Sequence, residues 1–393
     1  MKKCRLCKET KVELLIDFGK QPIVHHLLKN KDDDYDEYPF ELGFCSKCLL
    51  IQLMNPILPS ILYENYFTVS SWKNQSHIER FIDVMSSVTG INKNTQLLEI
   101  GCNDGIFLES LHKHGVKKCI GIEPSKDAYE IAVSKGLFVC NEFFTLKNRN
   151  LPFNTHQFDC IITRNVLEHI SDLEDFMLSV YRYLKDDGFL IIEVPDTSVQ
   201  LEYMDYALWE EHVNYFTLNT LRNLLKKFDF GIIHHEVTLV GGRSITVFAE
   251  KRSFKSSTDN INYFINDINN IQSYGKKWKI FKDRMSEFIL SKHKPVIYGC
   301  GARSSTFVNF LDLDNIVCFI DDQIEKQNYF VPGKKIEILP WNDHYLNNDI
   351  LIGVNTENEM KIINKRKLSS DHYFSILPPS RLLPSLWKEM IIK

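Results

Sequence analysis

The sequence has no long apolar run. No stretch of its 393 residues approaches the ~20 apolar residues that cross a bilayer, and no apolar segment follows the N-terminal lysines. An excess of positive charge is missing as well, since the formal net charge is -4 and no basic stripe occurs. Nor does any apolar surface stripe indicate a protein partner. These absences predict a cytoplasmic monomer that binds neither a membrane nor nucleic acid.

The ten cysteines fall into two classes. Two C-x-x-C pairs, Cys4 with Cys7 and Cys45 with Cys48, supply four thiolates that suit one tetrahedral ion and leave no open coordination position. This pattern predicts structural zinc. Four unrelated thiols, or a redox pair, are the competing interpretations. The other six lie singly in apolar segments, which predicts reduced and mostly buried thiols: Cys102, Cys119, Cys140, Cys160, Cys300 and Cys318.

Apolar patterning predicts an α/β protein of three units, over residues 1–65, 66–252 and 253–393. The first is the zinc ribbon. The second alternates short β-branched runs with helical patterns, as expected for a mostly parallel sheet. Its runs at 231–237 and 245–251 have no helix between them and predict an antiparallel edge pair. The third is a smaller, doubly wound α/β unit.

Two segments outside the strands also show helical patterns. After a loop that begins near residue 60, Ile78, Phe81, Ile82 and Met85 recur on one predicted helical face. The polar stretch 253–292 keeps apolar residues at helical spacing, which indicates a helical linkage rather than disorder.

The segment LLEIGCNDGIFL predicts a cofactor loop between a strand and a helix. Glu99 ends the strand, Gly101 and Gly105 bracket the turn, and Asn103 and Asp104 lie between them. Two glycines let the backbone approach a ligand closely, and the helix offers unpaired N–H groups at its start. The spacing is not G-x-G-x-x-G and no Lys-Ser/Thr pair follows, so a dinucleotide site or a P-loop is disfavoured.

Acidic side chains in this region favour S-adenosylmethionine over NAD. Glu123, at the end of the next strand, is placed to accept hydrogen bonds from both ribose hydroxyls. Glu99 and Asp104 would repel a pyrophosphate, but they suit a cofactor with a cationic amino-acid tail and a sulfonium.

Four motifs in order resemble class I methyltransferases: E-I-G-C-N-D-G at 99–105, G-I-E-P at 121–124, N-E-F-F at 141–144 and N-V-L-E-H-I at 165–170. The resemblance implies a Rossmann-like fold that binds S-adenosylmethionine. It implies that Asn141 and Phe143 lie near the adenine, Asn165 lies near the methionine end, and Pro124 lies beside Glu123 in the cofactor site. A nucleotide-type fold without a cofactor is the alternative.

The three-part plan resembles the sugar C-methyltransferases that act on nucleotide-linked 4-keto-6-deoxyhexoses, usually at C3. The likeness runs along nearly the whole chain, through Tyr63, Tyr66, Ser70 and Ser71, E-H-V-N-Y-F at 211–216, G-G-R-S at 241–244, Y-G-C-G-A-R at 298–303, Asp322, Lys326, Gln327, Pro332 and Gly333, and N-T-E-N-E at 355–359. It implies S-adenosylmethionine, structural zinc and a GDP- or dTDP-linked sugar substrate.

Methylation at such a carbon requires a base beside a ketone, because the C4 carbonyl acidifies the proton on C3. His212 is the best candidate, since an imidazole with a pKa near 6.5 accepts a proton at neutral pH. Its segment, WEEHVNYF, follows an apolar strand, beyond the end of the sheet where ligands bind. Glu211 could orient the ring or contact the sugar, provided that a turn brings both side chains into one cleft. A capping histidine on the surface is the alternative.

Two further catalytic candidates have open roles. His169 could pack beneath the cofactor or face the sugar. Tyr66 could donate a hydrogen bond to the C4 oxyanion or fill the space between the first two units. Trp209, Val240 and Thr68 depart from residues common in the relatives, and these departures leave the identity of the sugar open.

The C-terminal unit is expected to hold part of the substrate. Arg303, at the start of a helix, suits a diphosphate by its charge, and its glycine turn is too short for a dinucleotide site. The resemblance adds five more substrate candidates: Trp209, Tyr215, Lys326, Asn355 and Glu359. A purely structural C-terminal unit is the alternative. For the whole chain, the competing functions are a sugar O- or N-methyltransferase and a catalytically inactive zinc-ribbon binding protein.

Overall fold

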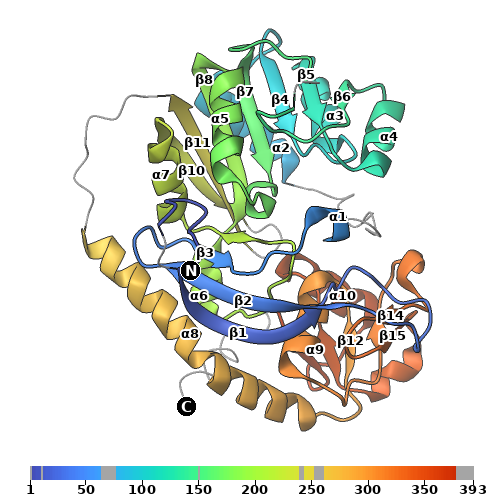
Figure 1. Cartoon of the computed structure of the whole chain (residues 1–393). Coiled ribbons are helices and arrows are strands. Elements are labelled where there is room, and N and C mark those ends of the chain that lie inside the picture. Colours follow the sequence, from blue (N-terminus) through green and yellow to red (C-terminus); the bar gives the residue numbers. More distant parts are fainter. Residues whose placement is uncertain are drawn as a thin grey trace.

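A computed structural model describes residues 2–9, 12–62, 77–148, 151–238, 243–251 and 261–377. Within these ranges the chain forms three sheets, of four, seven and six strands (Figure 1). The predicted α/β class, with a small N-terminal ribbon and two doubly wound units, is confirmed. The predicted unit boundaries, at 65–66 and 252–253, lie outside the described residues.

The four-stranded sheet is antiparallel, in the order β1-β2-β3-β9. Its strands are β1 (Val12–Pro22), β2 (Glu37–Cys45), β3 (Ile51–Leu53) and β9 (Asn214–Tyr215), and a short helix α1 (Pro59–Leu62) follows β3. The last strand comes from a distant part of the chain. Ile51 pairs with Tyr215 and Gln52 with Asn214, so the predicted ribbon is completed by a segment of the second unit.

The seven-stranded sheet has the order β10-β11-β8-β7-β4-β5-β6. Its strands are β4 (Gln96–Ile100), β5 (Lys118–Ile122), β6 (Val139–Cys140), β7 (Phe158–Arg164), β8 (Leu184–Pro195), β10 (Phe230–Thr238) and β11 (Ser244–Lys251). All pairs are parallel except β8 with β11 and β10 with β11. The antiparallel pair β10 and β11 confirms the predicted edge.

Helices cover both faces of this sheet. Neighbouring residues of a strand point to opposite faces, so they contact different helices. Leu97 packs with α2, α3 and α4, whereas Leu98 packs with α5 and α7. The helices of this unit are α2 (Ile78–Thr89), α3 (Ile106–Lys113), α4 (Lys126–Ser134), η2 (Leu167–His169), α5 (Leu173–Tyr183), α6 (Thr197–Tyr203) and α7 (Leu218–Lys227). The predicted apolar face of α2 is buried, as expected.

The six-stranded sheet has the order β14-β15-β13-β12-β16-β17, and only its edge strand β14 is antiparallel. Its elements are α8 (Ile261–Leu290), β12 (Val296–Tyr298), α9 (Ala302–Leu311), β13 (Phe319–Ile320), η3 (Ile324–Lys326), β14 (Phe330–Val331), β15 (Ile336–Leu339), η4 (Asp343–Asn347), β16 (Ile350–Ile352), α10 (Thr356–Arg366) and β17 (Tyr373–Ser375). The predicted helical linkage is the single 30-residue helix α8.

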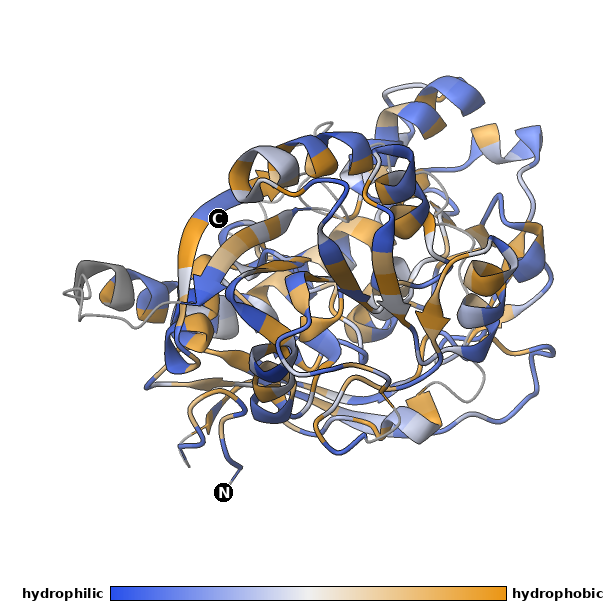
Figure 2. Ribbon diagram, turned by 90° about the horizontal axis from the view of Figure 1, so that it is seen from above, coloured by the Kyte–Doolittle hydropathy of each residue, from blue (hydrophilic) through white to orange (hydrophobic). Residues whose placement is uncertain are grey.

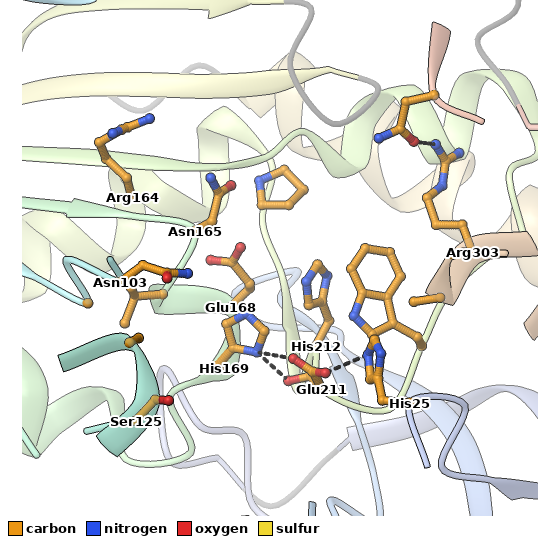
Figure 3. A pocket seen from close by; sticks show the side chains of 18 of the residues that line it. His25, Asn103, Ser125, Arg164, Asn165, Glu168, His169, Glu211, His212 and Arg303 are labelled. Carbon is orange, nitrogen blue, oxygen red and sulfur yellow. Dashed lines mark hydrogen bonds and ion pairs between the residues drawn. The ribbon is translucent and has the colours of Figure 1, made fainter. Parts of the chain in front are cut away.

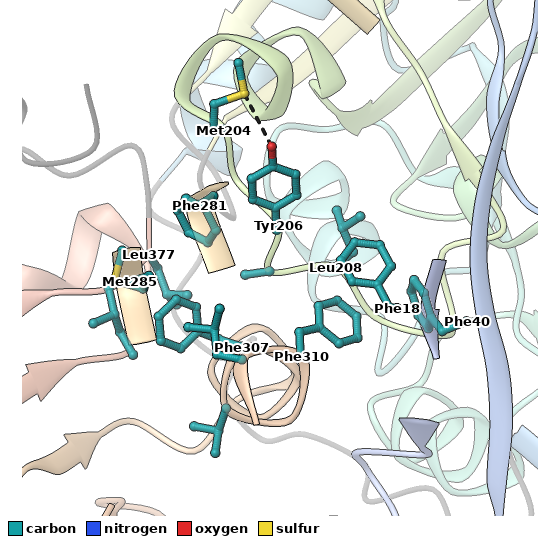
Figure 4. Packing of buried hydrophobic residues seen from close by; sticks show 14 of the residues in the cluster. Phe18, Phe40, Met204, Tyr206, Leu208, Phe281, Met285, Phe307, Phe310 and Leu377 are labelled. Atoms are coloured by element: carbon teal, nitrogen blue, oxygen red, sulfur yellow. Dashed lines mark hydrogen bonds between the residues drawn. The ribbon is translucent and has the colours of Figure 1, made fainter. Parts of the chain in front are cut away.

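One hydrophobic core joins the zinc-binding unit to the C-terminal unit (Figure 4). Phe18 of β1 stacks on Phe310 of α9, with ring centroids 4.1 Å apart. Tyr206, in the segment after α6, stacks on Tyr274 of α8 at 4.4 Å and donates a hydrogen bond to its carbonyl. The long helix α8 therefore packs against elements from all three predicted units.

Polar and apolar residues occupy different parts of this fold. Figure 2 shows hydrophobic residues along the inner strands and hydrophilic ones on the outer helical faces and loops. Among the described residues, no helix combines the length and apolarity needed to cross a membrane. The six single cysteines are free thiols, and all but the partly buried Cys140 are buried.

The shared core provides the first test. Phe310→Ala removes a buried ring that contacts β1, and we expect it to lower the free energy of unfolding by about 3–5 kcal/mol. Urea unfolding with cofactor absent measures this change. The matched control is Phe138→Ala, at a ring that is 59% exposed, where we expect a change within about 0.5 kcal/mol. Equal effects at the two positions would contradict the described packing.

Candidate active site

A cleft of about 1350 Å³ lies between the two parallel sheets. Its walls are the loops that follow β4, β5, β7 and β8 in one sheet and β12, β13 and β16 in the other. Val24, His25 and Leu27 of the zinc-binding unit line it as well. Ligands of open α/β folds bind at the carboxyl ends of the strands, and here both sheets present those ends to one space. A pocket for one small molecule is about 300–1,000 Å³, so this cleft has room for two ligands.

The loop after β4 depends on two glycines in the left-handed region. Gly101 has φ 71°, and a Cβ there would lie 2.4 Å from Cγ2 of Val166. Gly105 has φ 79° and begins α3, and a Cβ would lie 2.2 Å from Cδ1 of Leu137. Gly101 lines the cleft, whereas Gly105 lies behind the loop and lets α3 pack closely. Both glycines are required sterically, for different reasons.

Glu123 organises the neighbouring loop. Its Oε2 accepts a hydrogen bond from the Asn103 N–H at 2.9 Å, and its Oε1 accepts one from the Ser125 N–H at 2.8 Å. Burial raises the pKa of Glu123, and these two backbone hydrogen bonds oppose that shift. The Asn141 amide donates to the carbonyls of Glu123 and Pro124. Asn141 therefore supports this loop from behind and is not among the residues that line the cleft.

Glu99 places a buried carboxyl group at the floor of the cleft. Its Oε1 lies 3.9 Å from the Arg164 guanidinium, and its Oε2 has no hydrogen-bond partner among the described residues. Burial raises the pKa of Glu99 to about 8, although the charge of Arg164 opposes the rise. A buried carboxyl group with a free oxygen fits a cationic ligand, such as the amino-acid tail and sulfonium of S-adenosylmethionine.

Most of the predicted cofactor residues surround this end of the cleft. Those that line it are Glu99, Gly101, Asn103, Asp104, Glu123, Pro124, Phe143 and Asn165. The Phe143 ring is 61% exposed, which leaves a flat apolar face open beside the loop after β5. An exposed aromatic face of this kind suits an adenine ring.

At the centre of the cleft, Trp209 to Val213 form the turn that the candidate base requires. The His212 N–H donates to the Trp209 carbonyl at 3.2 Å, so the chain folds back and both Glu211 and His212 line the cleft. The Trp209 ring packs on the His212 ring with centroids 4.0 Å apart. The turn predicted as a condition for these two neighbours to share one cleft is present.

His212 lies in a buried group of polar side chains (Figure 3). Its ring meets the His169 ring edge-on, with centroids 4.9 Å apart. One nitrogen of each imidazole and one oxygen of Glu168 lie within 4.8 Å of one another. Burial lowers the pKa of His212 well below 6.5, and the nearby His169, His25 and Arg303 lower it further. His212 is therefore neutral at pH 7 and able to accept a proton.

Glu211 lies between two imidazoles (Figure 3). Its Oε1 is 2.5 Å from Nε2 of His25, and its Oε2 is 3.9 Å from Nδ1 of His169. The same His169 nitrogen is 3.0 Å from the Glu211 carbonyl. Because a carbonyl only accepts, Nδ1 of His169 carries the proton and Nε2 is left as an acceptor. Burial lowers the pKa of His169, the charge of His25 lowers it further, and Glu211 opposes both effects.

Two residues at this site were missed by sequence reasoning. His25 follows β1 in the N-terminal unit, and only tertiary structure brings it to Glu211. Glu168 belongs to the quoted N-V-L-E-H-I motif but received no role. Neither of its carboxyl oxygens has a hydrogen-bond partner among the described residues, and burial raises its pKa to about 8. In the sequence, the only sign of a role for Glu168 is its place next to His169 in this motif.

The C-terminal unit contributes a basic group to the opposite wall. Arg303 lies at the start of α9, where its guanidinium contacts the Asp205 carboxylate at 2.5 Å and donates to the Asn355 side chain at 3.1 Å. Lys326 donates to the Cys300 carbonyl at 2.7 Å. Arg303, Lys326 and Asn355 all line the cleft, as does Trp209 on the facing wall.

Besides Gly105 and Asn141, two predicted substrate residues are not among those that line the cleft. Tyr215 is buried in β9, and burial raises its pKa well above its usual value. Glu359 is fully buried and accepts a hydrogen bond from Ser375 at 2.5 Å. Tyr66 lies outside the described residues, together with Thr68 and Val240.

The four predicted zinc ligands come together at the end of the N-terminal sheet. Cys4 Sγ lies 3.4 Å from Cys48 Sγ, and Cys7 Sγ lies 3.5 Å from Cys45 Sγ. All four sulfur atoms lie within 4.8 Å of one another, and none forms a disulfide. Tetrahedral zinc with Zn–S bonds of about 2.3 Å separates its sulfur ligands by about 3.8 Å. The cluster fits zinc as a closed, structural site.

Comparisons with known families agree with this division. Residues 73–235 match a methyltransferase domain, residues 4–63 a putative zinc binding domain, and residues 241–354 a C-methyltransferase C-terminal domain. The chain therefore carries the domains of an S-adenosylmethionine-dependent methyltransferase. The three matches follow the predicted order, and they confirm the two predicted cofactors, S-adenosylmethionine and structural zinc.

Individual relatives cover parts of the methyltransferase. The C-methyltransferase NovU of Streptomyces niveus is 26% identical over 252 residues, which are 63% of this chain and 60% of NovU. A mitochondrial ubiquinone biosynthesis O-methyltransferase of Dictyostelium discoideum is 23% identical over 129 residues, which are 30% of this chain and 40% of that relative. The chain thus matches less than two thirds of either relative's length.

Solved structures align with about half of the chain. A SAM dependent methyltransferase from Aquifex aeolicus covers 46% of this chain and 94% of its own, with 20% identity and a TM-score of 0.36. The 1,6-didemethyltoxoflavin-N1-methyltransferase of Burkholderia thailandensis covers 53% and 97%, with 12% identity and a TM-score of 0.40.

Zinc removal tests the cysteine cluster. We expect the purified methyltransferase to contain one zinc per chain and Cys48→Ser to lose it, because three thiolates no longer close the tetrahedron. Plasma mass spectrometry measures the metal, and urea unfolding should show a lower midpoint for the variant. Cys140→Ser, at a single, partly buried thiol, is the control and should keep its zinc. Full zinc content in Cys48→Ser would contradict the site.

Cofactor binding should release a proton from Glu99. Its carboxyl group, with a pKa of about 8, is mostly protonated at pH 7, and a cationic ligand favours the ionised form. Calorimetry of S-adenosylmethionine binding in two buffers of different ionisation enthalpy should show proton release at pH 7 that disappears above about pH 9. Glu99→Gln should abolish the release, whereas Glu109→Gln, on the outer side of α3, should retain it. Equal release by both variants would assign the proton elsewhere.

Proposed function

We propose that this methyltransferase transfers a methyl group to C3 of a nucleotide-linked 4-keto-6-deoxy sugar. The observation that carries the proposal is the buried, neutral His212 in a cleft with one acidic and one basic wall. Similarity to the C-methyltransferase NovU and the match to a C-methyltransferase C-terminal domain support transfer to carbon.

The two walls of the cleft suit two different ligands. The acidic side chains of Glu99 and Glu123 favour a cofactor with cationic groups. Arg303 and Lys326, on the opposite wall, favour an anionic diphosphate. A sugar joined to that diphosphate would extend toward the centre of the cleft, where Glu168, His169 and His212 converge.

These residues support a proton abstraction next to a ketone. His212 takes the proton from C3, and the electrons of the C–H bond move toward the C4 oxygen, which becomes an oxyanion. Glu168, which is protonated at neutral pH, donates a hydrogen bond to that oxygen. S-adenosylmethionine, when bound, supplies the methyl group that the C3 carbon takes up. Glu168 is thus a second candidate for the donor role that the sequence suggests for Tyr66.

Transfer to oxygen or nitrogen is the second candidate, and the ubiquinone biosynthesis O-methyltransferases among the relatives favour considering it. Such a reaction leaves the carbon-bound proton in place. Incubation of the 4-keto sugar nucleotide with enzyme in deuterium oxide separates the two, since only the carbon mechanism exchanges the C3 proton. Retention of that proton together with a methyl group on oxygen would reject the proposal.

Variants of the two imidazoles test the base. His212→Asn should reduce both deuterium exchange at C3 and methyl transfer by about 100-fold or more, because a positioned base contributes about 10²–10⁴-fold. His169→Asn is the matched control, since it removes an imidazole 4.9 Å away, and it should retain measurable exchange. Exchange that survives in His212→Asn and is lost in His169→Asn would assign the base to His169 instead.

The pH profile tests the ionisation of His212. A base must be unprotonated, so kcat/KM should fall as the pH drops through the pKa of His212. Since burial lowers that pKa well below 6.5, the acidic limb should lie below the position expected for an ordinary histidine. An acidic limb at or above pH 6.5 would contradict this assignment.

A further inference from the structure

The zinc-binding unit reaches into the centre of the cleft through one side chain. His25 follows β1 and lines the cleft, and its Nε2 lies 2.5 Å from Oε1 of Glu211. Figure 3 shows Glu211 between His25 on one side and His169 on the other. His25 belongs to neither of the two sheets whose strand ends form the cleft.

The zinc-binding unit also forms hydrogen bonds to the residues on either side of Glu211 and His212. The Val24 N–H donates to Oε1 of Glu210 at 2.9 Å. Arg5, between two of the zinc ligands, donates to the Val213 carbonyl at 3.0 Å, and the Leu53 N–H donates to the same oxygen at 3.0 Å. Strand β9 then pairs with β3. The zinc-binding unit therefore contacts the catalytic turn before and after His212.

The contact between His25 and Glu211 is electrostatic as well as steric. Burial lowers the pKa of His25, but the charge and hydrogen bond of Glu211 outweigh it, with help from Glu210 and against Lys326, so the pKa is raised. Burial raises the pKa of Glu211, but His25, His169 and the nearby His26 lower it overall. A carboxylate and an imidazolium at this separation form a charge-assisted pair that fixes both side chains.

We propose that His25 is a positioning residue of the active site: its ion pair holds Glu211 in the orientation that places His169 and His212 toward the substrate. The inference rests on the proposed function. Glu211 bonds to His169 through its carbonyl, and His212 is the next residue in the same turn. The Glu211 carboxylate also lies 3.9 Å from Nδ1 of His169, so a displacement of Glu211 would disturb His169 directly and His212 through the turn that they share. Positioning within ~1 Å is worth about 100-fold in rate.

The ion pair has a signature that needs no turnover. In the resting full-length protein labelled with 15N-histidine, NMR should show the His25 ring more than half doubly protonated at pH 6.5, because its pKa is raised above that value. Glu211→Gln removes the two largest effects that raise the pKa of His25 and leaves burial, Glu210 and Lys326, so the ring should then be mostly neutral at the same pH. A neutral His25 in the unmodified protein would overturn the proposal, even if the enzyme methylates the sugar as proposed.

Enzyme kinetics tests whether loss of the ion pair between His25 and Glu211 slows methyl transfer. His25→Ala should lower kcat for methyl transfer by about 10- to 100-fold, with the KM for the sugar nucleotide changed less and the calorimetric affinity for S-adenosylmethionine unchanged. His25→Gln can still donate to Glu211, so it should recover most of the lost rate. His26→Ala is the matched control, since its ring contacts the Leu62 carbonyl and does not line the cleft.

The outcomes separate a positioning role from a structural one. If His25 only supports the fold, His25→Ala and His25→Gln would lose zinc or unfold together at lower urea, and kcat per folded enzyme would stay constant, which overturns the proposal. Unchanged kcat in a folded His25→Ala protein also overturns it. If no 4-keto sugar nucleotide is methylated but the NMR signature is present, the proposed function fails and the ion pair stands.

Discussion

The core that β1, α8 and α9 share with the segment after α6 fixes how the two parallel sheets face each other. Phe18, Tyr206, Tyr274 and Phe310 pack there without belonging to either sheet. With that core in place, the carboxyl ends of both sheets line one cleft. Neither sheet alone would surround a substrate, since each supplies only one side.

Local features of this fold could be predicted from the sequence because their causes are local. The cofactor loop follows from Gly101, whose conformation leaves no space for a Cβ, and from carboxylates at two strand ends. The face of α2 follows from the helical period, and the edge pair β10 and β11 from the missing helix. The zinc cluster follows from two matched spacings.

Long-range features could not be predicted in this way. No pattern around Ile51 indicates that it pairs with Tyr215, because a two-residue strand has no periodicity to detect. His25 and Glu211 are far apart in sequence, so their ion pair depends on that pairing. Motif membership alone does not place a residue at the cleft, since Tyr215 and Glu359 are buried within motif segments and are not among the lining residues. A motif marks a residue that the fold needs, whether or not it meets a ligand.

The strand pairing of β3 with β9 also bears on how such enzymes can be recombined. The turn that carries His212 is hydrogen-bonded to a sheet encoded more than 150 residues earlier. The unit boundary predicted from the sequence therefore does not separate the segments that form the site. A chimera that exchanges the methyltransferase sheet between two relatives would separate this turn from the strand that shapes it. Exchange of residues 2–62 together with 204–216 would keep the turn with its partner strand, and it would carry along Trp209, whose ring packs on His212.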